Sequence, residues 1–315
     1  MSPVTKENIT KTYQQPLLDL LYQAHSIYQK NFPKKDMQIS SLLSIKSGNC
    51  PEDCRYCAQS GHYKVDIKKH PLLKLETVIA AAKVAKENGA TRFCMGAAWR
   101  SPPDKTFQEV LTMIKEVKKL GLEACVTLGK LTTKQAKELK NAGLDFYNHN
   151  LDTSPEFYEK VITTRTYQER LETLNHIETA GLKTCCGAIL GLGECVDDRI
   201  SFLHALTQLK QMPESIPINV LEKFPGTPLG NNEPIDSFEI VRTIAAARII
   251  FPRARIRLSA GRRSMSDELH ALCFMAGANS IFIGQELLVG SNPSVSHDKQ
   301  LLQKLGIDAH ASSNG

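Results

Sequence analysis

Three cysteines lie close together in the segment NCPEDCRYC, directly after an apolar run. Cys50, Cys54 and Cys57 follow a C-x3-C-x2-C spacing. Three thiolates on one short loop are typical of a cubane iron–sulfur cluster, whose fourth iron stays open to a ligand or a substrate. Structural zinc usually takes four ligands from paired C-x2-C knuckles, and no second knuckle follows. The spacing therefore favours an iron–sulfur cluster over zinc.

Composition restricts the class of protein further. The chain has 315 residues, of which 42% are hydrophobic, so it can bury a full core. Its net charge of +6 is spread along the sequence, which argues against a nucleic-acid partner. The first residues, MSPVTKENITKTYQQ, lack a signal-peptide pattern, and no apolar run is long enough to span a membrane. We expect a cytoplasmic protein whose nine cysteines serve metal or redox chemistry rather than disulfides.

Eight short apolar runs alternate with helical patterns along the rest of the chain. This alternation predicts an α/β protein with a (β/α)8 TIM-type barrel, although an open, doubly wound sheet has the same element order. Residues 1–36 are predicted to form an N-terminal helical extension, 37–293 the barrel and 294–315 a loosely ordered C-terminal tail. The predicted strands are 37–44, 91–96, 122–128, 145–150, 183–190, 216–221, 254–259 and 280–283.

Helical patterns fill the intervals, and several end at a glycine. The clearest cover 77–88, 107–120, 134–142, 167–180 and 236–250. Glycine is the residue expected at a left-handed helix C-cap. The glycines in that position are Gly89, Gly121, Gly143, Gly181 and Gly277.

The carboxyl ends of the predicted strands carry polar and sulfur-containing side chains, although barrel interiors are usually aliphatic. A period of two residues puts members of one strand on one face, and such groups are costly to bury without partners. They therefore predict a ligand or a dense polar network. Each also has a plainer interpretation: a lone strand cysteine is usually a core residue, Asn150 and Asp152 could cap a loop, and Arg257 is ordinarily an anion clamp. The set comprises Cys94, Cys125, Asn148, Asn150, Asp152, Cys185, Asn219, Arg255, Arg257 and Ser259.

Together these segments resemble the radical S-adenosylmethionine (SAM) superfamily and, within it, the biotin synthase family. The resemblance extends from about residue 17 to residue 293. The cluster motif alone indicates only the superfamily. The features specific to the biotin synthase family are YNHNLDT, the strand cysteines and the arginine of RLSAGR. The segments that carry it are LLSIKSGNCPEDCRYCAQS, TRFCMGAAW, GLEACVTLG, AGLDFYNHNLDTSPEFY, TTRTYQERL, GLGE, IPIN, RLSAGR and CFMAGANSIF.

The resemblance implies two clusters and a set of binding residues. Cys50, Cys54 and Cys57 would hold a [4Fe–4S] cluster whose fourth iron is chelated by SAM. Cys94, Cys125, Cys185 and Arg257 would hold a [2Fe–2S] cluster inside the barrel. No protein acid or base would be needed for hydrogen abstraction. Contacts to SAM or substrate would come from Tyr56, from the backbone around Met95, Gly96 and Ala97, and from Asn150, Asp152, Arg170, Glu194 and Asn219.

The implied activity is sulfur insertion into dethiobiotin to give biotin. A homodimer, a flavodoxin- or ferredoxin-type electron donor and the iron–sulfur assembly machinery are the implied partners. One departure is visible: LLVGSNP has Val289 and Gly290 where family members often carry two threonines, so no hydroxyl is available there for the substrate carboxylate. Backbone N–H groups of the same loop could take that role instead. Two other functions compete with this one: another radical SAM enzyme with an accessory cluster, and a non-catalytic iron–sulfur sensor.

Overall fold

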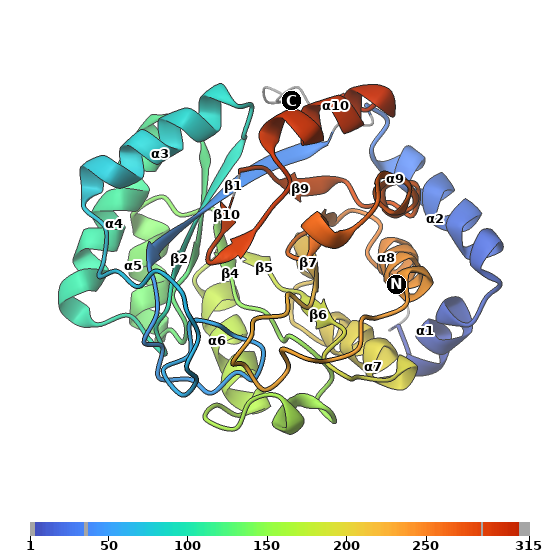
Figure 1. Cartoon of the computed structure of the whole chain (residues 1–315), viewed down its shortest axis with the longest axis horizontal. Helices are drawn as coiled ribbons and strands as arrows, with labels where there is room; N and C mark the ends of the chain where they lie inside the picture. The colour runs from blue at the N-terminus through green and yellow to red at the C-terminus, as the bar shows by residue number, and fades with distance from the viewer. Residues whose placement is uncertain (1–3, 35–36, 285, 309–315) are drawn as a thin grey trace.

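Parallel strands form a closed barrel in the middle of the computed structural model, which describes residues 4–34, 37–284 and 286–308 (Figure 1). The strand order is β5-β4-β3-β2-β1-β9-β8-β7-β6, and a further pairing of β5 with β7 closes the sheet. The predicted (β/α)8 barrel is confirmed, because an open sheet would leave β5 unpaired on that side. The strands are β1 (Gln38–Lys46), β2 (Arg92–Ala97), β3 (Glu123–Thr127), β4 (Phe146–Asn148), β5 (Lys183–Cys185), β6 (Ala188–Leu190), β7 (Ser215–Val220), β8 (Arg255–Leu258) and β9 (Ser280–Phe282).

The predicted strand 183–190 is broken into two pieces, β5 and β6. The break falls at Gly187, where an added β-carbon would overlap the backbone carbonyl of Pro217 on β7. Only glycine permits so close an approach of two backbones. The carbonyl of Gly187 instead accepts a hydrogen bond from the backbone N–H of Asp152 at 3.1 Å. This hydrogen bond connects the segment that follows β4 to the break between β5 and β6.

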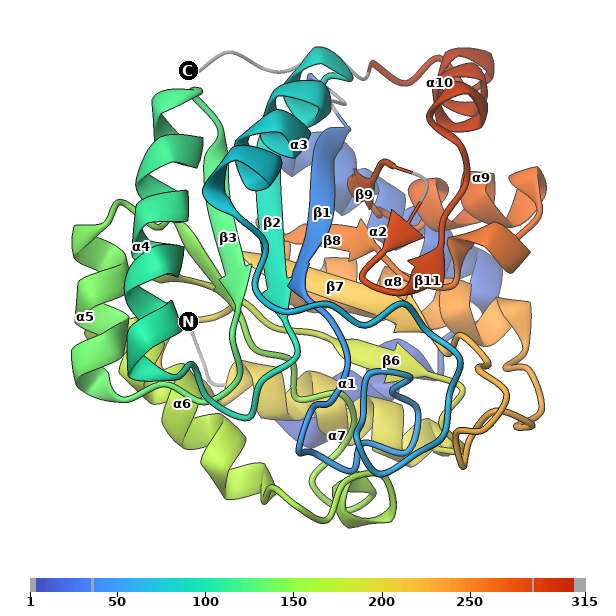
Figure 2. The same cartoon turned by 60° about the vertical axis from the view of Figure 1, so that its left-hand side comes forward.

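Helices cover the outside of the barrel (Figure 2). The five predicted C-cap glycines all have positive φ, between 70° at Gly181 and 103° at Gly277, as predicted. Capping boxes formed by Thr132 with Gln135 and by Thr166 with Glu169 begin α5 and α6. The outer helices are α3 (Leu75–Glu87), α4 (Asp104–Lys119), α5 (Thr133–Asn141), α6 (Tyr167–Thr179), α7 (Val196–Thr207), α8 (Ser237–Ile250) and α9 (Asp267–Met275), with short turns η1 (Tyr158–Lys160) and η2 (Arg262–Ser264).

The N-terminal helices α1 (Lys6–Tyr13) and α2 (Leu17–Asn31) lie against the outside of α7 and α8 (Figure 1). Tyr13 fixes this position, because its hydroxyl is 2.9 Å from the hydroxyl of Thr243 and accepts from Arg199 Nε at 3.0 Å. None of the helices that the described residues form combines the length and the apolar composition needed to cross a bilayer.

The segment after the barrel is more ordered than the sequence predicted. Residues 294–308 of the expected tail include α10 (Val295–Lys304), so the prediction of loose order was wrong there. Leu301 and Leu302 are buried, and Asp298 forms a buried ion pair with Arg262. Before α10, a short hairpin of β10 (Glu286–Leu287) and β11 (Gly290–Ser291) lies across one end of the barrel (Figure 2).

Candidate active site

One cavity of about 330 Å³ opens at the carboxyl ends of the barrel strands. It brings together both sets of predicted cysteines, which are far apart in the sequence. The rest of its wall comes from polar residues of β4 and β7, from the loop after β1 and from apolar residues of the β10–β11 hairpin. The predicted site residues that line it are Cys50, Cys54, Tyr56, Cys57, Cys94, Gly96, Ala97, Cys125, Asn150, Asp152, Arg170, Cys185, Asn219 and Arg257.

The loop that carries the first three cysteines follows β1 and is fixed by its own backbone. Cys50 N–H donates to the carbonyl of Gln59 at 2.9 Å, and Cys57 N–H donates to the carbonyl of Cys54 at 2.9 Å. Burial raises the pKa of the Cys57 thiol to about 11 and that of Cys54 well above its ordinary value, and each thiolate further disfavours its neighbours. A metal centre that binds thiolates would offset this cost. The thiol set therefore fits an iron–sulfur cluster.

Two carboxylates within the same loop attach it to the segment before α6. Glu52 is buried and accepts hydrogen bonds from Arg165 at 2.8 Å and Arg100 at 3.1 Å. Asp53 accepts from the backbone N–H groups of Thr163 and Thr164 at 2.9 and 3.1 Å. Burial disfavours the Asp53 carboxylate, but these donors prevail and lower its pKa to about 2. The sequence analysis did not identify this attachment, because Arg100 lies 48 residues from Glu52 and the other partners lie 110 or more residues away.

The three strand cysteines form a second sulfur group deeper in the barrel. Cys94 and Cys125 are register partners on β2 and β3. Hydrogen bonding with the Cys125 thiol and the nearby charge of Arg257 hold the pKa of Cys185 well below its ordinary value, whereas hydrogen bonding with its two neighbours and burial raise the pKa of Cys125 well above it. Asn148 Nδ2 lies 3.4 Å from Cys185 Sγ. The lowered pKa values of Cys94 and Cys185 give these two sulfurs thiolate character, which suits them to bind iron.

Arg257 of β8 lies against this second group. Its side chain is 1% exposed, and its Nη1 is 4.0 Å from Cys185 Sγ. The remaining donors bond only to neutral oxygens, those of Ser280 at 3.0 Å, Ser40 at 3.1 Å and Gln38 at 3.3 Å. Within the described residues no carboxylate pairs with it. A buried guanidinium without a counter-charge favours an anionic group among these sulfurs.

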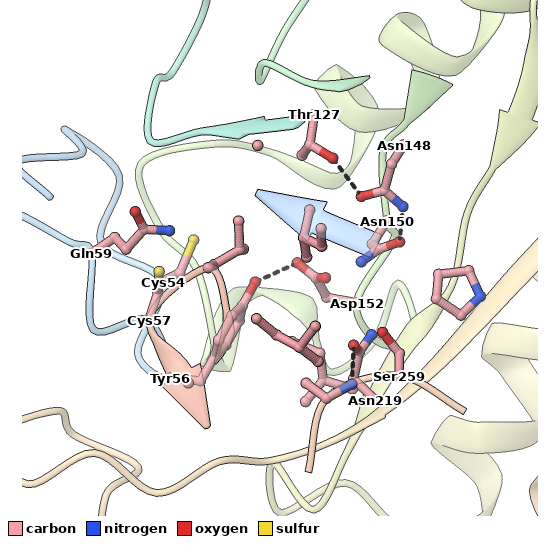
Figure 3. Close-up of a pocket in the computed structure, with 18 of the residues that line it drawn as sticks. Cys54, Tyr56, Cys57, Gln59, Thr127, Asn148, Asn150, Asp152, Asn219 and Ser259 are labelled. Atoms are coloured by element: carbon pink, nitrogen blue, oxygen red, sulfur yellow. Dashed lines mark hydrogen bonds between the residues drawn. The ribbon is translucent and has the colours of Figure 1, made fainter. Parts of the chain in front are cut away.

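A polar network links the cysteine loop to the exit of β4 (Figure 3). The Tyr56 hydroxyl donates to Asp152 Oδ2 at 2.8 Å, and Arg170 forms an ion pair with the same carboxylate at 2.7 Å. Arg170 also donates to the Asn150 carbonyl at 2.6 Å and to the Tyr158 hydroxyl at 2.7 Å. The Asp152 carboxylate lines the cavity and meets Tyr56 and Arg170 there rather than capping the loop, and its backbone has a left-handed φ of 67°. The network places an acceptor and several donors beside the loop.

Two side-chain amides lie across the cavity from the cysteine loop, and some of their hydrogen-bonding groups are already paired within the protein (Figure 3). Asn150 Oδ1 accepts from Asn148 at 3.0 Å and from Gly187 N–H at 3.1 Å. Asn219 Nδ2 donates to the carbonyl of Ala188 at 2.9 Å, and its Oδ1 accepts from the Ala260 N–H at 3.2 Å. Asn219 therefore joins β6 to the end of β8, and one N–H and one lone pair remain for a ligand.

Two predicted cofactor-binding residues do not reach the cavity with their side chains. Met95 is fully buried on the opposite face of β2, between the sheet and its helices, so only its backbone is near. The Glu194 carboxylate accepts from Gly191 N–H at 3.1 Å and pairs with Arg199 at 3.1 Å, outside the cavity. Glu194 shapes the glycine loop, and its carboxylate does not line the cavity.

Some lining residues were missed by the sequence analysis. His149, between Asn148 and Asn150, is buried with an unpartnered Nε2, and burial keeps its pKa well below the ordinary value. Glu222, after β7, also lines the cavity. His149 alternates with the predicted Asn148 and Asn150, so period-two counting assigned it to the outer face. Glu222 lies beyond the end of the predicted strand and carried no motif.

Sequence comparison identifies the relatives of this chain. Residues 44–206 match the family model of the radical SAM superfamily, and residues 217–308 match the biotin and thiamin synthesis associated domain. The curated biotin synthase of Coxiella burnetii is 59% identical over 300 residues, which is 95% of this chain and 94% of that protein. The biotin synthase of Legionella pneumophila (strain Corby) is 56% identical over 95% of each chain. This chain belongs to the biotin synthase family.

Solved structures support the fold of this biotin synthase family member. The crystal structure of methylornithine synthase superposes with a TM-score of 0.79 over 98% of this chain and 94% of that one, at 17% identity. The FeFe-hydrogenase maturase from Carboxydothermus hydrogenoformans gives a TM-score of 0.81 over 96% of this chain and 75% of that one, at 18% identity. Membership of the radical SAM superfamily implies a [4Fe–4S] cluster and SAM as cofactors.

Proposed function

We propose that this protein makes biotin by inserting a sulfur atom between two unactivated carbons of dethiobiotin. The supporting observation is the single cavity whose wall carries three thiols from a loop and three more from strands. A sensor would need the loop alone, and a radical SAM enzyme without a second cluster would not need the strand thiols. The high identity to curated biotin synthases over nearly the whole chain supports the same substrate.

Within this function Cys50, Cys54 and Cys57 would hold the [4Fe–4S] cluster. Cys94, Cys125 and Cys185 would hold a [2Fe–2S] cluster, with Arg257 as a further ligand or counter-charge. When bound, the first cluster would supply the electron for reductive cleavage of SAM, and the second would supply the sulfur. The protein supplies binding, orientation and exclusion of water.

The polar residues of the cavity divide by the groups they can bind. Asp152 and Arg170 offer an acceptor and donors beside the cysteine loop, where SAM would lie, with Tyr56 next to them. The free N–H and lone pair of Asn219, with the amide of Asn150, complement the N–H and carbonyl groups of a ureido ring. The backbone at Gly96 and Ala97 lines the side between the two cysteine groups.

Three partners are proposed from the family alone: a second copy of the chain, an electron donor of the flavodoxin or ferredoxin type, and the machinery that assembles iron–sulfur clusters. The test of the function is an anaerobic incubation of the cluster-loaded protein with SAM, a strong reductant and dethiobiotin. Mass spectrometry should detect biotin. Cleavage of SAM without any biotin, while dethiobiotin stays unchanged, would assign the protein to a different radical SAM reaction.

A further inference from the structure

The β10–β11 hairpin closes one end of the cavity with apolar side chains and a single carboxyl group. Leu287, Leu288 and Val289 line the cavity there, together with Phe224 from the segment after β7. Among the lining residues that the structure describes in these two segments, Glu222 is the only ionisable one. A ligand that reaches this end therefore meets an aliphatic wall and then one carboxyl.

Gly290 makes room for that carboxyl. A β-carbon added at residue 290 would overlap the Glu222 carboxylate, so the two residues are sterically coupled. Gly290 does not have a positive φ, so the backbone itself would accept another residue. The contact is with the end of a flexible side chain, so a larger residue at position 290 would displace the Glu222 carboxyl group rather than the backbone. Gly290 is also the position at which the sequence offered no hydroxyl to a substrate carboxylate.

Glu222 has few groups to offset its charge. It is half-buried, and the backbone N–H of Gly261, at the turn after β8, is the hydrogen-bond donor that favours its ionised form. Burial prevails and raises the pKa of Glu222 to about 7. The charged groups around it are exposed. Glu286 is on the hairpin, and Lys223, Glu233 and Arg263 line a second pocket, which Glu222 also lines.

We infer that Glu222, whose carboxyl group occupies the space that Gly290 leaves open, determines how the free carboxylate at the end of the substrate's aliphatic tail is bound. The inference rests on the proposed function, because dethiobiotin carries a ureido ring at one end and a carboxylate at the other. With the ring at the Asn150 and Asn219 amides, the tail extends along the apolar wall. As a neutral carboxyl, Glu222 donates a hydrogen bond to the tail carboxylate; as an anion, it repels it.

Binding of dethiobiotin is therefore linked to one proton on Glu222. The protonated fraction falls as the pH rises through about 7, so affinity falls in the same direction. From about pH 6 to about pH 8 the Kd should rise by up to about tenfold. A primary amide of dethiobiotin carries no charge and can donate to an ionised Glu222. Its binding should not weaken over the same range.

The test is anaerobic calorimetry of dethiobiotin and its amide on the cluster-loaded protein with SAM present, across this pH range. Wild type should show the tenfold loss for the acid and none for the amide. Glu222→Gln should bind the acid with no pH dependence, because a neutral donor is then always present. Glu233→Gln removes a nearby carboxylate outside the cavity and should retain the wild-type pH dependence.

Gly290→Ala provides a second test that depends on space alone. It should weaken binding of the acid, and the double variant Gly290→Ala, Glu222→Ala should tolerate the methyl group. A wild-type Kd that is constant with pH, or a slope that persists in Glu222→Gln, would overturn the inference while leaving the function intact. Absence of dethiobiotin binding at every pH and in every variant would overturn the proposed function and the inference with it.

Discussion

Arg165 donates a hydrogen bond to the Glu52 carboxylate at 2.8 Å, and both side chains are 5% exposed. Glu52 lies between two cysteines of the first cluster loop, whereas Arg165 lies just before α6. This buried ion pair therefore fixes the position of Cys50 and Cys54 relative to the strand ends. The second donor to Glu52, Arg100, comes from the loop after β2, so three barrel segments meet at one carboxylate.

Replacing that carboxylate should loosen the cluster loop. Glu52→Gln leaves the buried guanidinium of Arg165 without its counter-charge, which costs roughly 3–5 kcal/mol. We expect a lower free energy of unfolding and a lower iron content. Glu7→Gln is the matched control, because Glu7 forms an exposed ion pair with Lys11 that contributes little. Unchanged iron content and an unchanged free energy of unfolding in Glu52→Gln would show that the cluster loop does not depend on this ion pair for its position.

The two cysteine groups should be separable by single substitutions. Cys125→Ala removes the thiol that bridges Cys94 and Cys185, so the [2Fe–2S] absorption and biotin formation should be lost. Some SAM cleavage should survive, because the loop cysteines are untouched. Cys186→Ala, next to Cys185 but in the outer core, should keep both clusters. Loss of both cluster signals in a folded Cys125→Ala protein would instead indicate one shared site.

Asn219 should contribute to stability and to substrate recognition. Asn219→Leu leaves the Ala188 carbonyl and the Ala260 N–H without partners, at about 1–3 kcal/mol each, so the free energy of unfolding should fall. Loss of its free N–H and lone pair should also weaken dethiobiotin binding. Asn232→Leu, which removes a bond to the Gly191 carbonyl outside the cavity, should affect stability alone. Equal dethiobiotin affinity in wild type and Asn219→Leu would leave Asn219 a purely structural role.

Glu169, at the start of α6, should stabilise the fold in a pH-dependent way. Hydrogen bonds from Lys130 and from the Thr166 N–H, with Arg100 nearby, lower its pKa from 4.5 to about 2. A lowered pKa means that the ionised group contributes its full stability above 4.5 and loses it as the pH falls through about 2.

The substitution Glu169→Gln should therefore lower the free energy of unfolding at neutral pH, and the difference from wild type should shrink in acid. Chemical unfolding at about pH 7 and about pH 3 measures both. Glu172→Gln, an exposed residue of the same helix, should show no such trend. A difference that stays constant with pH would mean that packing, not charge, accounts for the role of Glu169.

Much of the site followed from the sequence because strand periodicity and short spacing are local. Cys94, Cys125 and Cys185 line the cavity because each occupies an inward position of a regular strand. Met95 shares the segment TRFCMG with Cys94 but faces outward, so a contact there would come from its backbone, as the resemblance implies. Period-two counting failed at His149, because the chain leaves β4 at Asn148 and regular alternation ends there.

Long-range contacts could not be read from the sequence. Glu194 belongs to the glycine loop, but Arg199 draws its carboxylate away from the cavity. The coupling of Glu222 to Gly290 joins residues from two unrelated loops, and neither spacing nor composition indicates it. The helix α10 is stabilised by burial of its own Leu301 and Leu302 against the rest of the protein. The polar residues at the end of the chain hid this short amphipathic pattern in the sequence.

The most direct test measures 5′-deoxyadenosine and biotin together, without air, in wild type, Cys54→Ala and Cys195→Ser. Cys54 lines the cavity, whereas Cys195 is exposed at the start of α7. Wild type and Cys195→Ser should form both products, and Cys54→Ala should form neither while its circular dichroism shows a folded barrel. If Cys54→Ala forms both products at the wild-type rate, the cysteine loop does not hold the cluster that cleaves SAM, and the proposed active site is wrong.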